Sequence, residues 1–328
     1  MDFPAPLILE RVFDDPTLIE PLIVRHAPYW NQAQYQPAPV RAASAATPAG
    51  HPFAMEGGAP PLFRGNWADG GSNVEGVESL AATPVLHQAA RQLFGGATSD
   101  TTFLYVNITA PMPGVDAVHV DVPAFLGLDR HNAPGWLLLS MNRSGLFDRW
   151  RVRTATAVVW FYEGTGGTLR YWPVGATGPS SEIAAVTNTA IVGDNDRMFH
   201  RVEAIGDPDL WRPVSRASEL HSTGPGLWEI RDGDEVLSSY RFDQLRVSLS
   251  WKAAVWLDDE DRRRWLGHSD DLTLAHATDM LADQLRARGL WADDHGATDD
   301  PEFVEAIMAG YPRTVPVDDS VSRDRPGA

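Results

Sequence analysis

The chain has 328 residues, of which 43% are hydrophobic and 9% aromatic, and it carries a formal net charge of −17. These proportions are typical of a folded globular protein and exclude a largely disordered one. The negative charge disfavours nucleic acid and anionic membranes as partners, because both bind positive surfaces.

The sequence gives no sign of secretion or membrane attachment. No apolar run reaches the roughly 18 residues that a membrane helix needs, and the opening Met1-Asp2-Phe3-Pro4 lacks the basic residues of a signal peptide. Cysteine is absent, which excludes disulfides and thiolate metal sites. We therefore expect a cytoplasmic protein.

Residues 1–100 are predicted to form an N-terminal region of helices and loops that packs on the core. Residues 7–12 have the pattern of a strand. Asp15-Pro16 begins a helix with an apolar stripe, and a second helix over residues 85–94 ends at Gly95-Gly96. Residues 36–76 are rich in Pro, Gly and Ala, so we expect a long loop there and consider it a candidate lid.

Residues 101–257 change to short stretches of strand character, separated by Gly, Pro and Asp. Many strands with little helix between them predict a mainly β fold with flanking helices, built as an antiparallel barrel or jelly roll. The predicted strands cover 102–108, 118–122, 136–140, 154–162, 167–172, 184–192, 198–205, 228–231, 235–240 and 244–256. Helical spacing returns in residues 258–312, and the Pro-, Asp- and Arg-rich tail 313–328 is predicted to be disordered.

His119 and Asp121 are one residue apart within the β-branched run of residues 118–122. Because side chains alternate along a strand, both project from the same face. An imidazole and a carboxylate side by side provide two of the three ligands in a two-His-one-carboxylate site for non-haem Fe(II).

A second His-x-Asp pair, His268 and Asp270, competes with the first. It stands at a predicted helix start, where Asp270 has a structural use as a cap. His276 would be its nearest third ligand, but one local segment would then have to supply the whole site. We therefore favour His119 and Asp121.

The first pair has distant partners in the predicted strands. His200 stands near the start of a later strand, within His-Arg-Val. In the last strand Arg246, Ser248, Ser250 and Lys252 share one face. Buried Arg and Ser cost free energy unless they bind something, and a carboxylate would satisfy them.

In this order, His119-x-Asp121, His200 and Arg246-x-Ser248 resemble the Fe(II)/2-oxoglutarate-dependent oxygenases. The run from Gly167 to Pro173 also looks like a mid-barrel turn of such enzymes. Over about residues 101–256 the resemblance implies a double-stranded β-helix (jelly-roll, cupin-like) core. It implies Fe(II) held by His119, Asp121 and His200, and 2-oxoglutarate whose far carboxylate pairs with Arg246 and accepts a hydrogen bond from Ser248.

The resemblance also bears on the reaction. A carboxylate ligand at Asp121 leaves no room for a halide, which favours hydroxylation, desaturation or ring formation over halogenation. One departure concerns the arginine, which in many family members follows the distal histidine much more closely than Arg246 follows His200. A predicted hairpin near residues 228–240 would then be an insertion. Arg212 fits the shorter spacing but lies in poor strand sequence, and Lys252 is a third candidate.

Two other functions remain open at this point. One is a cupin-type metalloenzyme that does not use 2-oxoglutarate, in which Arg246 and Ser248 would bind a substrate carboxylate. The other is a non-catalytic β-sandwich binding protein with His119 and His200 as core residues. A small molecule is the expected substrate. Trp136, Trp150, Trp160, Tyr162 and Trp172 are either pocket or core residues, and Arg149, Arg151 and Arg153 either meet an anionic substrate or form a solvated face.

Overall fold

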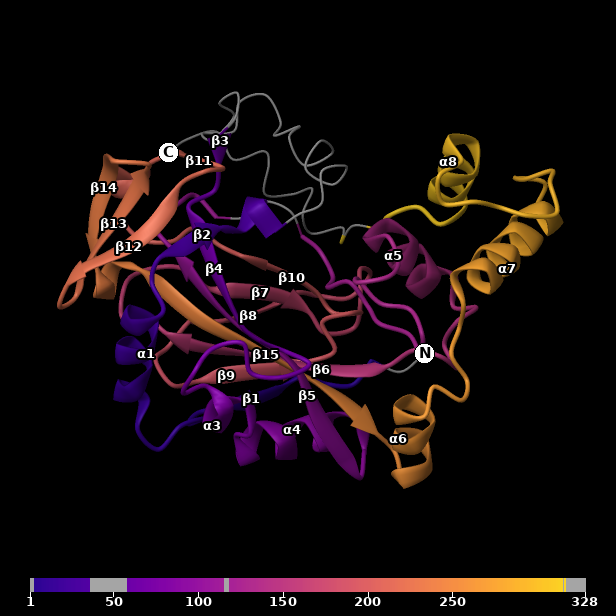
Figure 1. Ribbon diagram of the computed structural model, residues 1–328, viewed down its shortest axis with the longest axis horizontal. Coiled ribbons are helices and arrows are strands. Elements are labelled where there is room, and N and C mark those ends of the chain that lie inside the picture. Colours follow the sequence, from indigo (N-terminus) through magenta and orange to yellow (C-terminus); the bar gives the residue numbers. More distant parts are fainter. Residues whose placement is uncertain (1–2, 36–57, 115–117, 315, 317–328) are drawn as a thin grey trace.

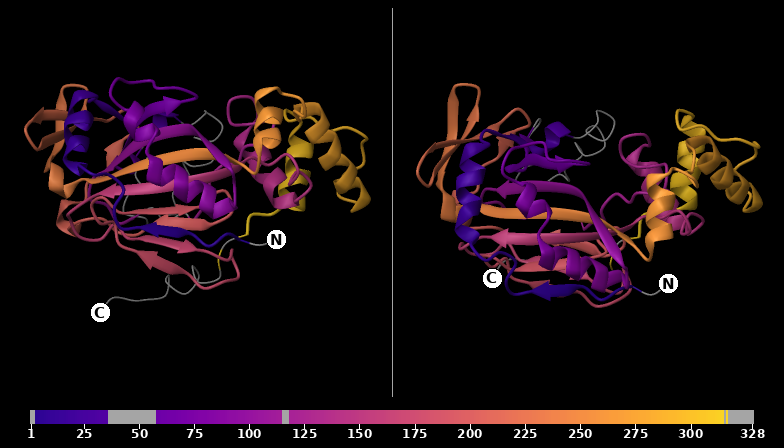
Figure 2. Two further views of the ribbon diagram at one scale, coloured as in Figure 1. Left: turned by 90° about the horizontal axis from the view of Figure 1, so that it is seen from below. Right: turned by 60° about the horizontal axis from the view of Figure 1, so that its bottom comes forward.

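The computed structural model describes residues 3–35, 58–114, 118–314 and 316. A large antiparallel sheet crosses the molecule, with the helices α5 to α8 gathered at one end and the strands β12 to β14 at the other (Figure 1). The two further views of Figure 2 show the same separation. Among the described helices, none combines the length and the apolar character needed to cross a membrane.

The large sheet has ten strands and is organised around β15. In pairing order they are β1 (Leu7–Leu9), β9 (Ala190–Gly193), β6 (Arg153–Phe161), β15 (Arg246–Trp256), β5 (Thr98–Thr109), β4 (Leu62–Asp69), β2 (Tyr29–Asn31), β12 (Glu219–Gly224), β13 (Leu227–Asp232) and β14 (Glu235–Arg241). Every residue of β15 is buried, because β5 and β6 flank it and both of its faces are covered. Val247, Leu249 and Trp251 belong to the main apolar cluster, so Arg246, Ser248, Ser250 and Lys252 lie on the opposite face.

A second, smaller sheet pairs β10 (Phe199–Val202), β7 (Leu169–Trp172) and β8 (Ser181–Ile183). The backbone at His119 extends it, since His119 and His200 exchange both of their N–H···O bonds, at 3.1 and 2.9 Å. Along the chain, β5, β6, β9 and β15 belong to the large sheet, whereas His119, β7, β8 and β10, which lie between them, belong to or extend the small one; β11 pairs with β3, and β12 to β14 return to the large sheet. This alternation is a double-stranded β-helix, as the sequence predicted.

Helices and short elements surround the two sheets. They are η1 (Pro16–Leu18), α1 (Ile19–Arg25), η2 (Gln32–Tyr35), β3 (Gly58–Ala59), α3 (Glu78–Ala81), α4 (Pro84–Phe94), α5 (Gly135–Ser144), η3 (Pro208–Leu210), β11 (Val214–Ser215), η4 (Phe242–Gln244), α6 (Asp259–Leu266), α7 (Leu274–Ala287) and α8 (Pro301–Gly310). The predicted helices at 85–94, 258–266, 272–288 and 301–309 are confirmed. The predicted hairpin near 228–240 is also confirmed, as β13 and β14, and it lies between β10 and β15.

Four predicted elements differ from the structure. The strand predicted over 118–122 is only an isolated bridge at His119, and of the strand predicted over 184–192 only residues 190–192 are in a strand, β9. Residues 136–140 form part of helix α5 and not a strand, because a short apolar run does not distinguish a buried helix from a buried strand. The loop predicted over 36–76 contains β3, β4 and a paired position at Ser72, so it is not structureless after residue 57.

Other predictions concern residues beyond those described. Residues 36–57 lie outside the described part of the chain, so the predicted lid stays a prediction. The same holds for the predicted disorder of the tail, of which the structure describes only residues 313, 314 and 316.

The predicted domain boundaries near residues 100 and 257 also stay predictions.

Candidate metal centre

His119, Asp121 and His200 come together at the junction of the small sheet with the residue 118–122 segment. One ligand atom from each residue lies within 4.8 Å of the others. Among the described residues, this is the group of His, Cys, Asp or Glu side chains that lies close enough together to hold a metal ion. The imidazole rings of His119 and His200 have centroids 4.4 Å apart. A backbone hydrogen bond of 2.8 Å from the Asp121 amide to the Asn195 carbonyl fixes the third position. Two imidazoles and one carboxylate thus face a common point.

The hydrogen bonds of His200 leave its Nε2 available as a ligand atom. The ring is buried, and its Nδ1 lies 2.9 Å from the Met198 carbonyl oxygen, which accepts only if Nδ1 carries the proton. This tautomer places the lone pair on Nε2, 3.8 Å from Oδ1 of Asp121. Burial and the neighbouring His119 lower the pKa of His200 to about 4, so the ring is neutral at pH 7. A neutral imidazole is the form that binds metals.

Asp121 is held as a carboxylate by the only lysine of the chain. Lys252 Nζ lies 2.7 Å from Asp121 Oδ2. Burial by itself would raise the pKa of Asp121, but the ammonium of Lys252 and the two nearby imidazoles lower it well below its usual range. The same ion pair offsets the effect of burial on Lys252 and raises its pKa. Sequence reasoning considered Lys252 only as a cosubstrate ligand and missed this contact.

Arg246 lies on the same face of β15 as Lys252, in the interior of the barrel. Only 3% of its surface is exposed. Its Nε donates to the Gly167 carbonyl at 2.8 Å, and its Nη2 is buried without a hydrogen-bond partner. Burial lowers the pKa of Arg246 to about 10, so the guanidinium remains charged at pH 7. A buried cation with an unsatisfied donor is suited to bind an anion.

Ser248 and the alternative residues occupy different places. Ser248 is buried two residues from Arg246 on the same face of β15. Arg212 instead donates to the carbonyl groups of Asp209 and Trp211 in its own exposed loop. The described hydrogen bonds therefore give Arg212 a local partner and leave a donor of Arg246 without one.

A buried polar group that the sequence reading missed adjoins the centre. Arg151 Nη2 lies 2.5 Å from Asp194 and 4.0 Å from Asp196. Both carboxylate oxygens of Asp196 are buried without hydrogen-bond partners. Burial raises the pKa of Asp196 to about 7, although Lys252 and Arg151 oppose that rise. The sequence signal was the run Asp194-Asn195-Asp196 directly after β9.

The three arginines near residue 150 all have protein partners. Arg149 and Arg153 pair with Asp270 and Asp261, at 3.4 and 3.2 Å, while Arg151 pairs with Asp194. Of the five aromatic candidates for a pocket, three are buried in apolar clusters, namely Trp150, Trp160 and Tyr162, and Trp172 is also fully buried. Trp136 is partly buried on α5.

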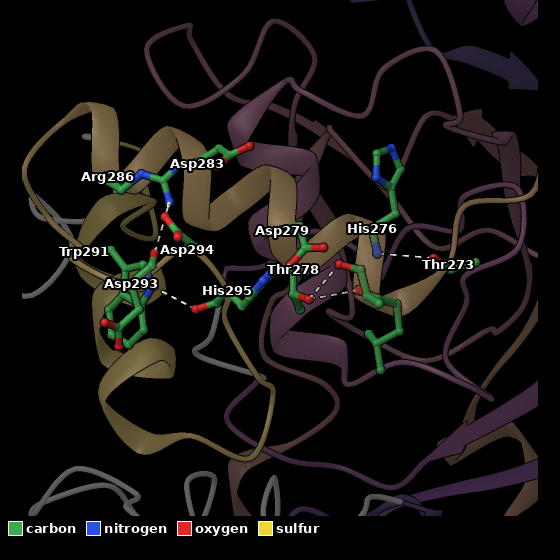
Figure 3. A network of polar contacts seen from close by, with 12 residues as sticks. Thr273, His276, Thr278, Asp279, Asp283, Arg286, Trp291, Asp293, Asp294 and His295 are labelled. Carbon is green, nitrogen blue, oxygen red and sulfur yellow. Dashed lines mark hydrogen bonds and ion pairs between the residues drawn. The ribbon is translucent and has the colours of Figure 1, made fainter.

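The second His-x-Asp pair does not converge on one point. His268 Nδ1 lies 2.9 Å from Asp271, and Asp270 pairs with Arg264 at 3.1 Å. Figure 3 shows His276 on the first turn of α7, where its backbone amide donates to Thr273. Further along α7, Asp279 pairs with His295 and Arg286 pairs with Asp294.

Of the comparisons with known proteins, the one with solved structures found similar chains. No family model and no curated protein matches the chain. A prolyl-4-hydroxylase of Pseudomonas putida is 15% identical, with 76% of this chain and 92% of that one covered and a TM-score of 0.36. The 2-oxoglutarate-dependent epimerase SnoN from nogalamycin biosynthesis is 14% identical, with 77% of each chain covered and a TM-score of 0.39.

A third solved structure holds ligands. HygX from Streptomyces hygroscopicus, with nickel, 2-oxoglutarate and hygromycin B bound, is 10% identical, with 77% and 84% of the two chains covered and a TM-score of 0.38. Because identity and TM-score are low, the function proposed below rests on the side chains of this chain. The likeness to these solved structures is one of fold.

Proposed function

We propose that the protein is an Fe(II)- and 2-oxoglutarate-dependent oxygenase that acts on a small molecule. The proposal rests mainly on the convergence of His119, Asp121 and His200 in one barrel. The interior of the same barrel also holds Arg246, which has a buried N–H donor without a hydrogen-bond partner. Two imidazoles and one carboxylate fit Fe(II) and leave positions for other ligands. The free Nη2 of Arg246 fits a carboxylate oxygen, which a dicarboxylate such as 2-oxoglutarate supplies at its far end.

The residues of the chain have separate tasks in this proposal. His119, Asp121 and His200 would hold the metal. Arg246 would pair with the far carboxylate of 2-oxoglutarate, and Ser248 would add a hydroxyl donor. The metal and 2-oxoglutarate would together activate dioxygen for oxidation of a substrate C–H bond. Burial of Arg246 strengthens its pairing with an anion, because little water is present to compete for the charge.

The protonation states of Asp121 and His200 suit metal binding at neutral pH. Lys252 keeps Asp121 ionised, and burial keeps His200 neutral. Neither ligand would therefore have to lose a proton when a divalent metal binds near pH 7. Asp121 as the third ligand favours hydroxylation, desaturation or ring formation over halogenation in this proposal.

The test of the metal centre is anaerobic Fe(II) binding by equilibrium dialysis. The wild type is expected to bind one Fe(II), and His119→Ala and His200→Ala are each expected to lose that binding at least tenfold. His276→Ala is the matched control, because it removes an exposed histidine of the competing segment, and it should bind as the wild type does. Binding that follows His276 instead of His200, or that no histidine variant reduces, would overturn the assignment.

A second measurement separates the proposal from its rivals. Succinate released from 2-oxoglutarate, in the presence of Fe(II) and air, should require His200 and should be absent from heat-treated protein. Tight Fe(II) binding without any effect of 2-oxoglutarate would favour a cupin-type metalloenzyme. Absence of metal binding in the folded wild type would favour a binding protein.

A further inference from the structure

Lys252 is placed where it can control how Asp121 presents its two oxygens. It is the only lysine of the chain, and 8% of its surface is exposed. It lies between Phe103 of β5 and Thr156 of β6 in the large sheet. Its Nζ contacts Asp121 across 131 residues of sequence. A charged side chain at such a buried strand position costs free energy unless its partner is fixed.

The two oxygens of Asp121 have different surroundings. Oδ2 accepts the 2.7 Å hydrogen bond from Lys252 Nζ, whereas Oδ1 lies 3.8 Å from Nε2 of His200. The oxygen that lies near His200 Nε2 is therefore the one that the lysine leaves available. A carboxylate without such a partner can bind a metal through both oxygens.

We infer that Lys252 is a positioning residue that limits Asp121 to one ligand atom and thereby keeps one further metal position open. This inference rests on the proposed function, because an open position has a use only if the metal must bind other ligands. Partners of this kind orient metal ligands in many proteins.

The number of water molecules bound to the metal shows whether Asp121 binds through one oxygen or two. A divalent metal with octahedral preference that takes three protein atoms keeps about three waters, and one that takes a fourth atom from Asp121 keeps about two. Mn(II) is the suitable probe, because it favours octahedral oxygen-rich sites and its bound waters accelerate the relaxation of solvent protons. Relaxation per bound Mn(II) is thus a direct measure of the number of open positions.

The experiment compares Mn(II)-loaded wild type with Lys252→Met, which is similar in length but has neither charge nor donor. We expect relaxation per bound Mn(II) to fall by about one third in Lys252→Met. Lys252→Arg, which keeps a charged donor, should restore most of the wild-type value. Arg262→Met is the matched control, because it removes a cation that pairs with Asp100 at 2.7 Å away from the centre, and it should leave relaxation unchanged.

The relaxation of the variants decides whether Lys252 limits Asp121 to one ligand atom. Equal relaxation in Lys252→Met and wild type would overturn the inference, as would a fall of the same size in Arg262→Met. If Lys252→Met does not fold, Lys252→Leu replaces it, since its side chain likewise has neither charge nor donor, and the same fall is expected. Adding 2-oxoglutarate to the Mn(II)-loaded wild type tests the proposed function separately: displacement of about two waters supports it, and no displacement refutes it without affecting the lysine result.

Discussion

Burial and the nearby positive charges have opposite effects on the pKa of Asp196. Burial raises its pKa to about 7, with Lys252 and Arg151 opposing the rise and Asp194 adding to it. An unfolded aspartate has a pKa near 4. Between these two values the folded state binds more protons than the unfolded state, so the free energy of unfolding falls as pH rises through this window.

The variant Asp196→Asn should remove this dependence. In urea unfolding of the metal-free protein, the free energy of unfolding of the wild type is expected to fall by roughly 1–3 kcal/mol relative to that of Asp196→Asn between about pH 5 and pH 7.5. Asn keeps the size of the side chain and cannot ionise. Parallel pH profiles for the two proteins would contradict the burial of an ionisable Asp196.

The spacing of His119 and Asp121 predicted that their side chains lie close together, and His200 was placed from its strand pattern. The structure brings all three together, although Asp121 is not in a strand and His119 forms only an isolated bridge. Their role as metal ligands stays a prediction. The contact of Lys252 with Asp121 could not be predicted, because it depends on the register of β15 against segments far away in the chain. Whether Arg246 and Ser248 bind a carboxylate stays a prediction.

The turn that leads into β7 is the element on which the placement of Arg246 most depends. Gly167 has a φ of +68°, and its carbonyl accepts the hydrogen bond from Arg246 Nε. A Cβ at Gly167 would lie 2.6 Å from Cδ of Arg246. The position therefore requires glycine both for its backbone conformation and for the close approach of the arginine.

Gly167→Ala should consequently weaken 2-oxoglutarate binding, and Gly233→Ala should not. Gly233 has a φ of +60° in the turn between β13 and β14, with nothing within 4 Å of an added Cβ. Both variants should lose about 1 kcal/mol of stability from backbone strain. Calorimetric titration of the metal-loaded proteins should show at least a fivefold weaker affinity for Gly167→Ala alone; equal affinities would contradict the proposed role of Arg246.

Elements were predictable where a long periodic pattern or a turn signal defined them. Strand β15 and helices α4 and α7 were of this kind, and Asp232-Gly233-Asp234 marked the hairpin of β13 and β14. Helix α5 was mistaken for a strand because its apolar run is short. Its ends did carry signals, namely Pro134 before the first turn and Gly145 in the left-handed conformation after the last.

At the scale of the whole molecule, the double-stranded β-helix explains how residues 119, 200 and 246 reach one interior. The chain moves between the large sheet at β5, β6, β9 and β15 and the small sheet at His119, β7, β8 and β10, so strands distant in sequence become neighbours. The strands β11 to β14 lie in the chain between β10 and β15, which lengthens the interval between His200 and Arg246 without separating their strands from the barrel. The sequence predicted this class of fold from strand number and motif order. It did not predict that β4, β2 and β12 extend the large sheet, because their pairings depend on tertiary contacts.

The central claim is that this interior binds Fe(II) and 2-oxoglutarate together, and anaerobic titration of the metal-free protein with both tests it most directly. The account predicts a weak visible charge-transfer absorption that needs both additions, disappears in His200→Ala and requires at least tenfold more 2-oxoglutarate in Arg246→Gln. Arg212→Gln should behave as the wild type. Fe(II) binding without the absorption would contradict the role of 2-oxoglutarate, and an unchanged titration in Arg246→Gln would contradict the role of the arginine.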